Sequence, residues 1–281
     1  MCAEDYRSLE TDHFRIFYDA SGEKVARTAA RVAEDAHLHI TDFLNSHPQE
    51  KIEMWIAPNR SEFRRASGGR IPDWGIGLAA PTQRRILVLS PADAPARIDL
   101  EEIITHEIAH MLLGMTLPGQ PLPRWFDEGH AMFQAREWRI AESTRIVWAL
   151  LARTLIPLSE LTNSFPYERA SAELAYTESY TAVDFMVRTE GLDTFREFVR
   201  RAAHTGDFEA ALIEVYGWNL ARFDDEWRKH LRGRYPWAVL PGVLLSIPGI
   251  FTLLFLAAYL RKRRKARRRL AQWEEEDLRF R

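Results

Sequence analysis

The pentapeptide His106-Glu107-Ile108-Ala109-His110 carries the clearest chemical signal in the sequence. Residues four apart on a helix lie on one face, so the two imidazoles can reach a single metal ion. Glu107 lies between them, where a carboxylate can take a proton from a water molecule activated by that metal. The pattern predicts a zinc site with Glu107 as the general base. The alternative is a structural helix whose two histidines hydrogen-bond to backbone carbonyls.

This pentapeptide must lie on a helix, which the sequence predicts over residues 98–115. Four apolar residues recur at helical spacing on the side away from the histidines and should pack into the core: Ile104, Ile108, Met111 and Leu112. That arrangement gives the helix one dry face and one face for metal ligands. A zinc site of this kind needs at least one further protein ligand and keeps its fourth position open for water.

The next informative segment is Pro-Arg-Trp-Phe-Asp-Glu-Gly-His-Ala at residues 123–131. Together with the pentapeptide it resembles the gluzincin metallopeptidases, and over residues 9–232 the chain looks most like the peptidase MA-like family of metallohydrolases. That family shares the H-E-x-x-H helix, a P-x-W-x-x-E-G-x-A segment and a later A-Y-x-x-S helix, which here matches residues 175–179. The resemblance implies that Glu128 joins His106 and His110 as the third ligand of one zinc ion.

The neighbours of Glu128 are expected to contribute in other ways. Asp127 projects to another side of its helix and should orient a zinc-binding histidine rather than bind the metal. His130 faces away from Glu128 and is expected to be a packing or surface residue. In thermolysin-like relatives an aspartate four residues after the glutamate ligand orients a histidine, but Met132 occupies that position here. The carboxylates behind the histidines must therefore be arranged differently.

A hydrogen-bond donor for the substrate oxygen is expected on a later helix. Gluzincins commonly place a tyrosine or histidine there, aimed at the charge that develops when water attacks the carbonyl. The helix predicted over residues 170–190 carries Tyr176 and Tyr180 on one face. Tyr176 falls inside the A-Y-x-x-S match, so the resemblance favours it as a catalytic residue. The alternative is that both tyrosines are packing residues.

The strand that precedes the zinc helix bears on specificity. Gluzincins bind an extended substrate along an edge strand, which by resemblance is residues 75–80 here. Aminopeptidases carry a glutamate in this strand to hold the free amine of the substrate, and residues 75–80 contain none. We therefore expect internal cleavage of a peptide or protein that pairs with the strand edge.

The pattern of apolar residues predicts an α+β fold, with a small αβ lobe at residues 1–96 and a mainly helical lobe at residues 97–235. By resemblance this is a gluzincin, thermolysin-like arrangement. Strands are predicted over residues 13–19, 51–57, 75–80 and 84–90. Helices are predicted over residues 22–45, 59–66 with Asn59 as N-cap, 98–115, 125–135, 141–154, 170–190, 192–204, 208–216 and 219–231.

A long uncharged segment follows at residues 237–260 and is long enough to cross a bilayer as a helix. Trp237 and Tyr259 lie at its two ends, where aromatic rings favour the membrane interface. Eight Lys and Arg residues follow within the next nine positions. We expect a transmembrane helix over residues 236–260 and a basic tail over residues 261–281. The alternative is a buried core helix followed by a solvated basic segment.

The charge distribution suggests how the chain is oriented. Residues 261–281 carry 10 Lys and Arg against 4 Asp and Glu, whereas the whole chain has 38 against 40. The rest of the chain is therefore acidic, which argues against nucleic-acid binding. The positive-inside rule places the basic tail in the cytoplasm, so we expect a single-pass protein of the cell membrane with an extracytoplasmic catalytic domain.

Two features near the N-terminus bear on the expected location and on disulfide formation. Residues 1–12 contain no apolar run typical of a signal peptide, so export requires a signal that has been removed. The alternative is a tail-anchored cytosolic enzyme. Cys2 is the single cysteine, which excludes a disulfide within the chain.

These features together predict a membrane-anchored zinc metallopeptidase that acts as an endopeptidase. Its expected partners are a peptide or protein substrate and the lipid bilayer. The alternative is a non-catalytic, membrane-anchored module that keeps the gluzincin fold to bind a protein partner. The intact Glu107 argues against that module, because partner binding needs no general base.

Overall fold

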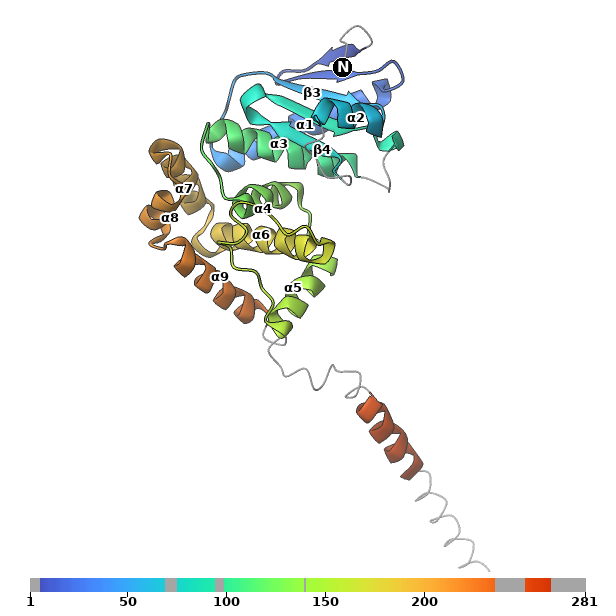
Figure 1. Cartoon of the computed structure of the whole chain (residues 1–281), viewed down its shortest axis with the longest axis vertical. Coiled ribbons are helices and arrows are strands. Elements are labelled where there is room, and N and C mark those ends of the chain that lie inside the picture. Colours follow the sequence, from blue (N-terminus) through green and yellow to red (C-terminus); the bar gives the residue numbers. More distant parts are fainter. Residues whose placement is uncertain (1–5, 69–74, 94–98, 139, 236–250, 264–281) are drawn as a thin grey trace, which may run out of the picture. The chain divides into compact units, whose positions relative to one another are not determined.

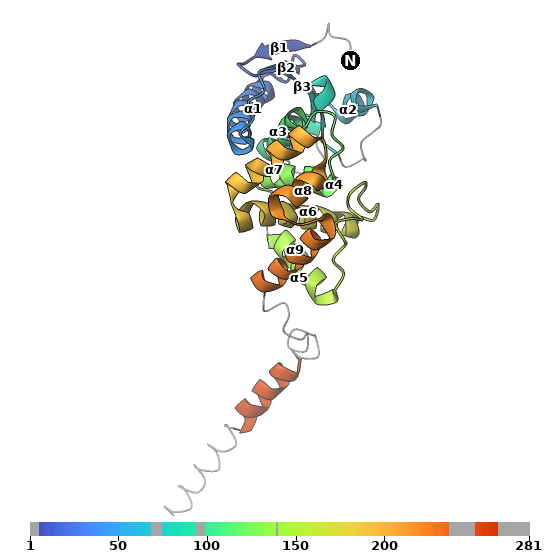
Figure 2. The ribbon, with the colours of Figure 1, turned by 90° about the vertical axis from the view of Figure 1, so that its left-hand side faces the viewer.

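The computed structural model describes residues 6–68, 75–93, 99–138, 140–235 and 251–263 (Figure 1). Residues Met1–Arg234 form one compact unit and residues Tyr235–Arg281 form a second. In the first unit a small sheet with its helices lies at one end, and further helices make up the remainder (Figures 1 and 2). The fold is thus mixed α+β and mostly helical, as the sequence predicts.

The sheet has five strands in the order β1-β2-β3-β5-β4. β2, β3 and β5 run parallel, whereas β1 pairs antiparallel with β2 and β4 pairs antiparallel with β5. β4 is therefore an edge strand. The strands are β1 Arg7–Glu10, β2 Phe14–Tyr18, β3 Ile52–Ala57, β4 Gly77–Ala80 and β5 Arg85–Leu89.

Alternating side chains divide the sheet into two faces. On one face β2 buries Phe14, Ile16 and Tyr18, and helices α1 (Glu23–Leu44) and α3 (Leu100–Thr116) contact the sheet. On the other face Phe63 of α2 (Arg60–Ser67) packs in a small cluster with Ala57, Leu87 and Leu89. α3 thus packs against β4 and β5 of the sheet.

The remaining helices follow α3 in chain order. They are α4 (Arg124–Ala135), α5 (Ile140–Ala152), α6 (Arg169–Glu190), α7 (Leu192–Thr205), α8 (Phe208–Tyr216) and α9 (Leu220–Arg234). Their core is strongly aromatic, because Trp125, Phe126, Phe195, Phe198, Phe208 and Phe223 are all buried. α4 packs against both α3 and α6, so it links the helix of the pentapeptide to the helix of the two tyrosines.

Gly129 allows the close packing of α4 against α6. A Cβ at Gly129 would lie 2.2 Å from the backbone oxygen of Ser179 on α6. Because that oxygen belongs to a helix backbone, it has little freedom to move away. The glycine after Glu128 therefore meets a packing requirement, and lets α4 approach α6 closely.

The predicted strands and helices of the first unit are present, with ends that differ by a few residues. Asn59 caps α2 as expected, since its Oδ1 accepts a hydrogen bond from the Glu62 N–H at 2.9 Å. β1 was not predicted. Its sequence, Arg-Ser-Leu-Glu, holds one apolar residue and pairs at the sheet edge, so it has no alternating pattern to detect. The division into lobes at residue 96 stays a prediction.

The predicted membrane segment falls largely outside the described residues. Residues 237–250 of it are not described, while residues 251–260 belong to a helix that extends to residue 263 with exposed side chains. Of the helices in the described part of the chain, none combines the length and the apolar character that crossing a membrane requires. Residues 264–281 of the basic tail also lie outside the described residues.

Candidate metal centre

The pentapeptide histidines are held by the packing of α3. The face predicted to be buried is confirmed, because Ile104, Ile108, Met111 and Leu112 expose no surface. At the start of the helix, the Glu101 N–H donates to the Asp99 side chain at 3.0 Å. The histidines occupy the opposite face, which is directed toward α4 and is only partly covered.

Glu128 is positioned by the start of α4. The backbone N–H groups of Arg124 and Trp125 donate to the carbonyls of Thr162 at 2.7 Å and Leu161 at 3.1 Å. Trp125 is fully buried. These contacts fix the first turn of α4, and Glu128 follows one turn later on the side that faces α3.

The three predicted ligands converge. His106 Nε2 and His110 Nε2 lie 3.1 Å apart, and Glu128 Oε2 lies 3.7 Å from each of them. Ligand atoms about 2.1 Å from a tetrahedral zinc ion are about 3.4 Å from one another, so this triangle has the size that zinc requires. In the described part of the chain, these residues are the only group of three or more His, Cys, Asp or Glu side chains placed to hold a metal ion.

A carboxylate stands behind each imidazole. His110 Nδ1 donates to Asp127 Oδ1 at 2.8 Å, and His106 Nδ1 donates to Glu137 Oε1 at 2.6 Å. With Nδ1 as the donor, each Nε2 presents its lone pair to the centre of the triangle. The contact predicted between Asp127 and a histidine of the pentapeptide is therefore present.

Glu137 was missed by the sequence reasoning. It lies just beyond α4, where Arg136 adopts a left-handed conformation and the Glu137 N–H returns to the Met132 carbonyl at 3.0 Å. Because the chain has left the helix, helical spacing from Glu128 gives no information about this residue. Trp138 stacks on Tyr180 of α6 at 4.7 Å between ring centroids, which helps to fix the segment.

The charges around the triangle favour a cation. Burial opposes protonation of His106, but the nearby carboxylates of Glu128 and Glu137 outweigh burial and raise its pKa to about 10. Burial also acts against the pKa of His110, yet Asp127 and Glu128 raise it well above its usual value. Burial would raise the pKa of Glu128, but the two imidazoles hold it far below its usual range. A bound dication would take the place of the protons.

Glu107 lies beside the triangle and under the edge strand. Its side chain is buried, and burial raises its pKa above the usual value although both histidines oppose that shift. A Cβ at Gly77 of β4 would lie 2.2 Å from Glu107 Oε1. Any larger residue at Gly77 would have to displace the carboxylate, so β4 and Glu107 are fitted to each other.

Tyr176 lies on α6 close to the triangle. Burial and the charge of Glu128 raise the pKa of its phenol, while Arg124 and His110 lower it. Its ring packs edge-to-face on Phe165 at 4.9 Å between centroids. The neighbouring Tyr180 instead stacks on Trp138.

His130 is a core residue, as expected. It is fully buried, packs beside the rings of Phe43 and Phe195, and pairs with Gln134 at 3.3 Å. Burial lowers its pKa to about 3, so it is neutral at physiological pH. It therefore contributes packing rather than a metal ligand.

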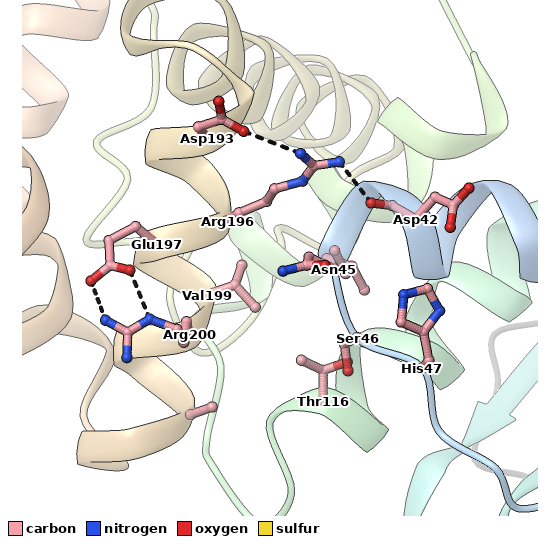
Figure 3. Close-up of a pocket in the computed structure, with 12 residues that line it drawn as sticks. Asp42, Asn45, Ser46, His47, Thr116, Asp193, Arg196, Glu197, Val199 and Arg200 are labelled. Carbon is pink, nitrogen blue, oxygen red and sulfur yellow. Dashed lines mark hydrogen bonds and ion pairs between the residues drawn. The ribbon is translucent and has the colours of Figure 1, made fainter.

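A polar cavity of about 730 Å³ lies between the ends of α1 and α3 and the side of α7 (Figure 3). None of the candidate site residues lines it. Arg196 in its wall donates to the Asp42 carbonyl at 2.8 Å and pairs with Asp193 at 3.1 Å. Arg200 pairs with Glu197. Both arginines thus have acceptors within the wall, and we assign no ligand to this cavity.

Comparison with known proteins identifies one family and a set of distant structures. The model of the peptidase MA superfamily matches residues 32–233. No curated protein sequence matches the chain. Native LTA4 hydrolase from yeast is similar in structure at 12% identity and a TM-score of 0.48, over 79% of this chain and 38% of that one. An M1 zinc metallopeptidase from Deinococcus radiodurans is similar at 19% identity and a TM-score of 0.44, over 79% and 51%. This chain therefore spans about half or less of each of those proteins.

Proposed function

The chain belongs to the peptidase MA superfamily, and on that premise we propose that it is a zinc-dependent peptidase. The observation that carries this proposal is the triangle of His106, His110 and Glu128, with the buried carboxylate of Glu107 beside it. The donor set of two imidazoles and one carboxylate is typical of catalytic zinc sites. The decisive experiment is hydrolysis of peptides by the metal-loaded chain and by its Glu107→Gln variant.

The chain's own residues supply the proton transfer. When bound, one zinc ion would supply a Lewis acid that polarises the substrate carbonyl and acidifies water. Glu107 takes the proton from the attacking water and then gives it to the leaving amine. Its raised pKa suits that task, because a carboxylate with a higher pKa is a stronger base than an exposed carboxylate. Asp127 and Glu137 keep both imidazoles correctly oriented.

The substrate is proposed to lie along β4. The Leu89 N–H bonds to the Ile76 carbonyl, so Ile76 and then Leu78 direct their backbone groups toward β5. Gly77 and Ala79 consequently direct theirs to the free side of the edge strand. An extended peptide can pair with those groups directly above Glu107. β4 carries no acidic side chain to hold an amino terminus, which favours endopeptidase action.

Tyr176 is proposed to stabilise the oxygen of the attacked carbonyl. Removing one such donor costs about 10²–10³ in turnover. Tyr176→Phe is therefore expected to lower kcat by that factor, with zinc affinity and melting temperature nearly unchanged. Steady-state kinetics, metal titration and calorimetry measure the three quantities. Tyr180→Phe is the matched control, and a loss of rate in that variant alone would transfer the role to Tyr180.

The protein is further proposed to be anchored in the cell membrane by residues 237–260, with the basic tail in the cytoplasm and the peptidase unit outside. The support is the uncharged length of this segment and the eight cations that follow it. Alkaline carbonate strips peripheral proteins from membranes, so the full chain is expected to stay in the pellet. Its release into the supernatant would contradict an integral anchor.

A further inference from the structure

Arg124 reaches the candidate metal centre from the first turn of α4. It precedes Glu128 by four residues and therefore shares its helix face. Its Nη2 lies 3.4 Å from Glu128 Oε1, whereas Glu128 Oε2 faces the two histidines at 3.7 Å. The two oxygens of this carboxylate thus have different partners: one serves the metal triangle and the other the guanidinium.

The ring of Phe165 holds the guanidinium in place. Arg124 Cζ lies 4.8 Å from the centroid of Phe165, which is a cation–π contact. Phe165 is itself buried and packs against Tyr176. The ring of Phe165 thus contacts both Arg124 and Tyr176. The guanidinium is therefore ordered before any ligand arrives, which lowers the entropic cost of binding one.

The same guanidinium is open to solvent. The side chain of Arg124 is 41% exposed, compared with 15% for Glu128. A guanidinium has five N–H donors in a planar fork, so the contact to Glu128 leaves donors for a further partner. Once Glu128 shares its negative charge with a bound dication, it neutralises Arg124 less. A planar anion is the partner that such a group prefers.

We propose that Arg124, supported by Phe165 and beside Tyr176, forms a subsite for a carboxylate of the peptide substrate. Arg124 is then a specificity-determining residue, and the preferred substrates carry an acidic group near the bond that is cut. This inference rests on the proposed peptidase function. The carboxylate has two sources in a peptide, namely an Asp or Glu side chain or the free C-terminal end.

Binding to an inert enzyme tests the subsite without turnover. The full-length Glu107→Gln chain, loaded with zinc, is titrated with neutral peptides in which one Gln at each position in turn is replaced by Glu, all with blocked ends. A second pair differs only in a free or an amidated C-terminus. Each acidic peptide is compared with its neutral counterpart. For the carboxylate that fits the subsite best, whether a Glu side chain or the free C-terminus, we expect Kd to be about 10- to 100-fold lower than for the neutral peptide, the range of a charge-assisted hydrogen-bond pair.

Variants of Arg124 then assign the preference to this side chain. Arg124→Gln is expected to abolish the preference, and Arg124→Lys to keep part of it because the charge remains without the planar fork. Arg169→Gln is the matched control. Arg169 is likewise the first residue of its helix and pairs with a glutamate four residues later, but it is 93% exposed on α6 and should leave the preference intact.

The outcomes separate this inference from the function on which it rests. Peptide hydrolysis by the wild-type chain together with equal Kd values for acidic and neutral peptides would overturn the subsite and leave the peptidase standing. Absence of peptide binding and of hydrolysis would overturn both. The comparison of peptides on the Glu107→Gln chain decides the matter even if an Arg124 variant fails to fold.

Discussion

Glu107→Gln is expected to abolish peptide hydrolysis while zinc stays bound. Glutamine keeps the size of the side chain but cannot take the proton from the attacking water. General-base catalysis of this kind contributes about 10²–10⁴ to the rate, so turnover should fall close to the background of the assay. Metal binding should survive, because the three candidate ligands and the carboxylates that orient them are untouched.

The measurement pairs metal analysis with turnover of a general peptide library by both chains. Glu101→Gln is the matched control, since Glu101 lies on the same helix with an exposed side chain. Substantial residual turnover in Glu107→Gln would remove this residue from the role of base. A wild-type chain that binds zinc but cleaves no peptide of the library would instead favour the non-catalytic binding module.

The parts of the site that could be predicted from sequence are those encoded locally. The two histidines and the buried face of α3 follow from helical spacing within one segment. Glu128 and Asp127 lie within a short motif whose family resemblance implies the third ligand. Each of these predictions needs only the geometry of a single helix, together with one packing contact between α3 and α4.

The parts that were missed depend on contacts between distant segments. Glu137 reaches His106 only because the chain turns sharply after α4. The fit between Gly77 and Glu107 depends on how β4 crosses α3. The spacing of apolar residues in the sequence contains no information about that crossing. The sequence pattern identifies Arg124 only as an ordinary helix residue. Its contact with Phe165, 41 positions later in the chain, is present only in the folded structure. Helical spacing alone cannot supply such relations.

Stability is expected to depend on pH through Glu178, a carboxyl group of α6 that the proposed reaction does not use. Glu178 is fully buried; its Oε1 accepts the Ile156 N–H at 3.0 Å and its Oε2 has no hydrogen-bond partner. Burial raises its pKa to about 8, although the Ile156 N–H and the charge of Arg228 oppose this. At neutral pH the folded protein therefore keeps a proton here that the unfolded chain has lost.

The direction of the effect follows from this difference in bound protons. The folded pKa lies above the unfolded value of 4.5, so the stabilisation is complete below about pH 4.5 and is lost as pH rises toward 8. Its full size is on the order of 3–5 kcal/mol, since each unit of pKa difference corresponds to about 1.4 kcal/mol. Glu178→Gln removes the titrating group, and its free energy of unfolding should lack this decline.

Denaturant unfolding measures the difference directly. Both chains are unfolded at a series of pH values from 4.5 to 9, with the zinc concentration fixed. Because other groups titrate equally in both chains, the gap between the two curves isolates Glu178. We expect Glu178→Gln to become more stable relative to wild type as pH rises, and Glu190→Gln, at the exposed end of the same helix, to run parallel to wild type. A gap that stays constant from pH 4.5 to 9 would mean that Glu178 ionises alike in the folded and unfolded chains.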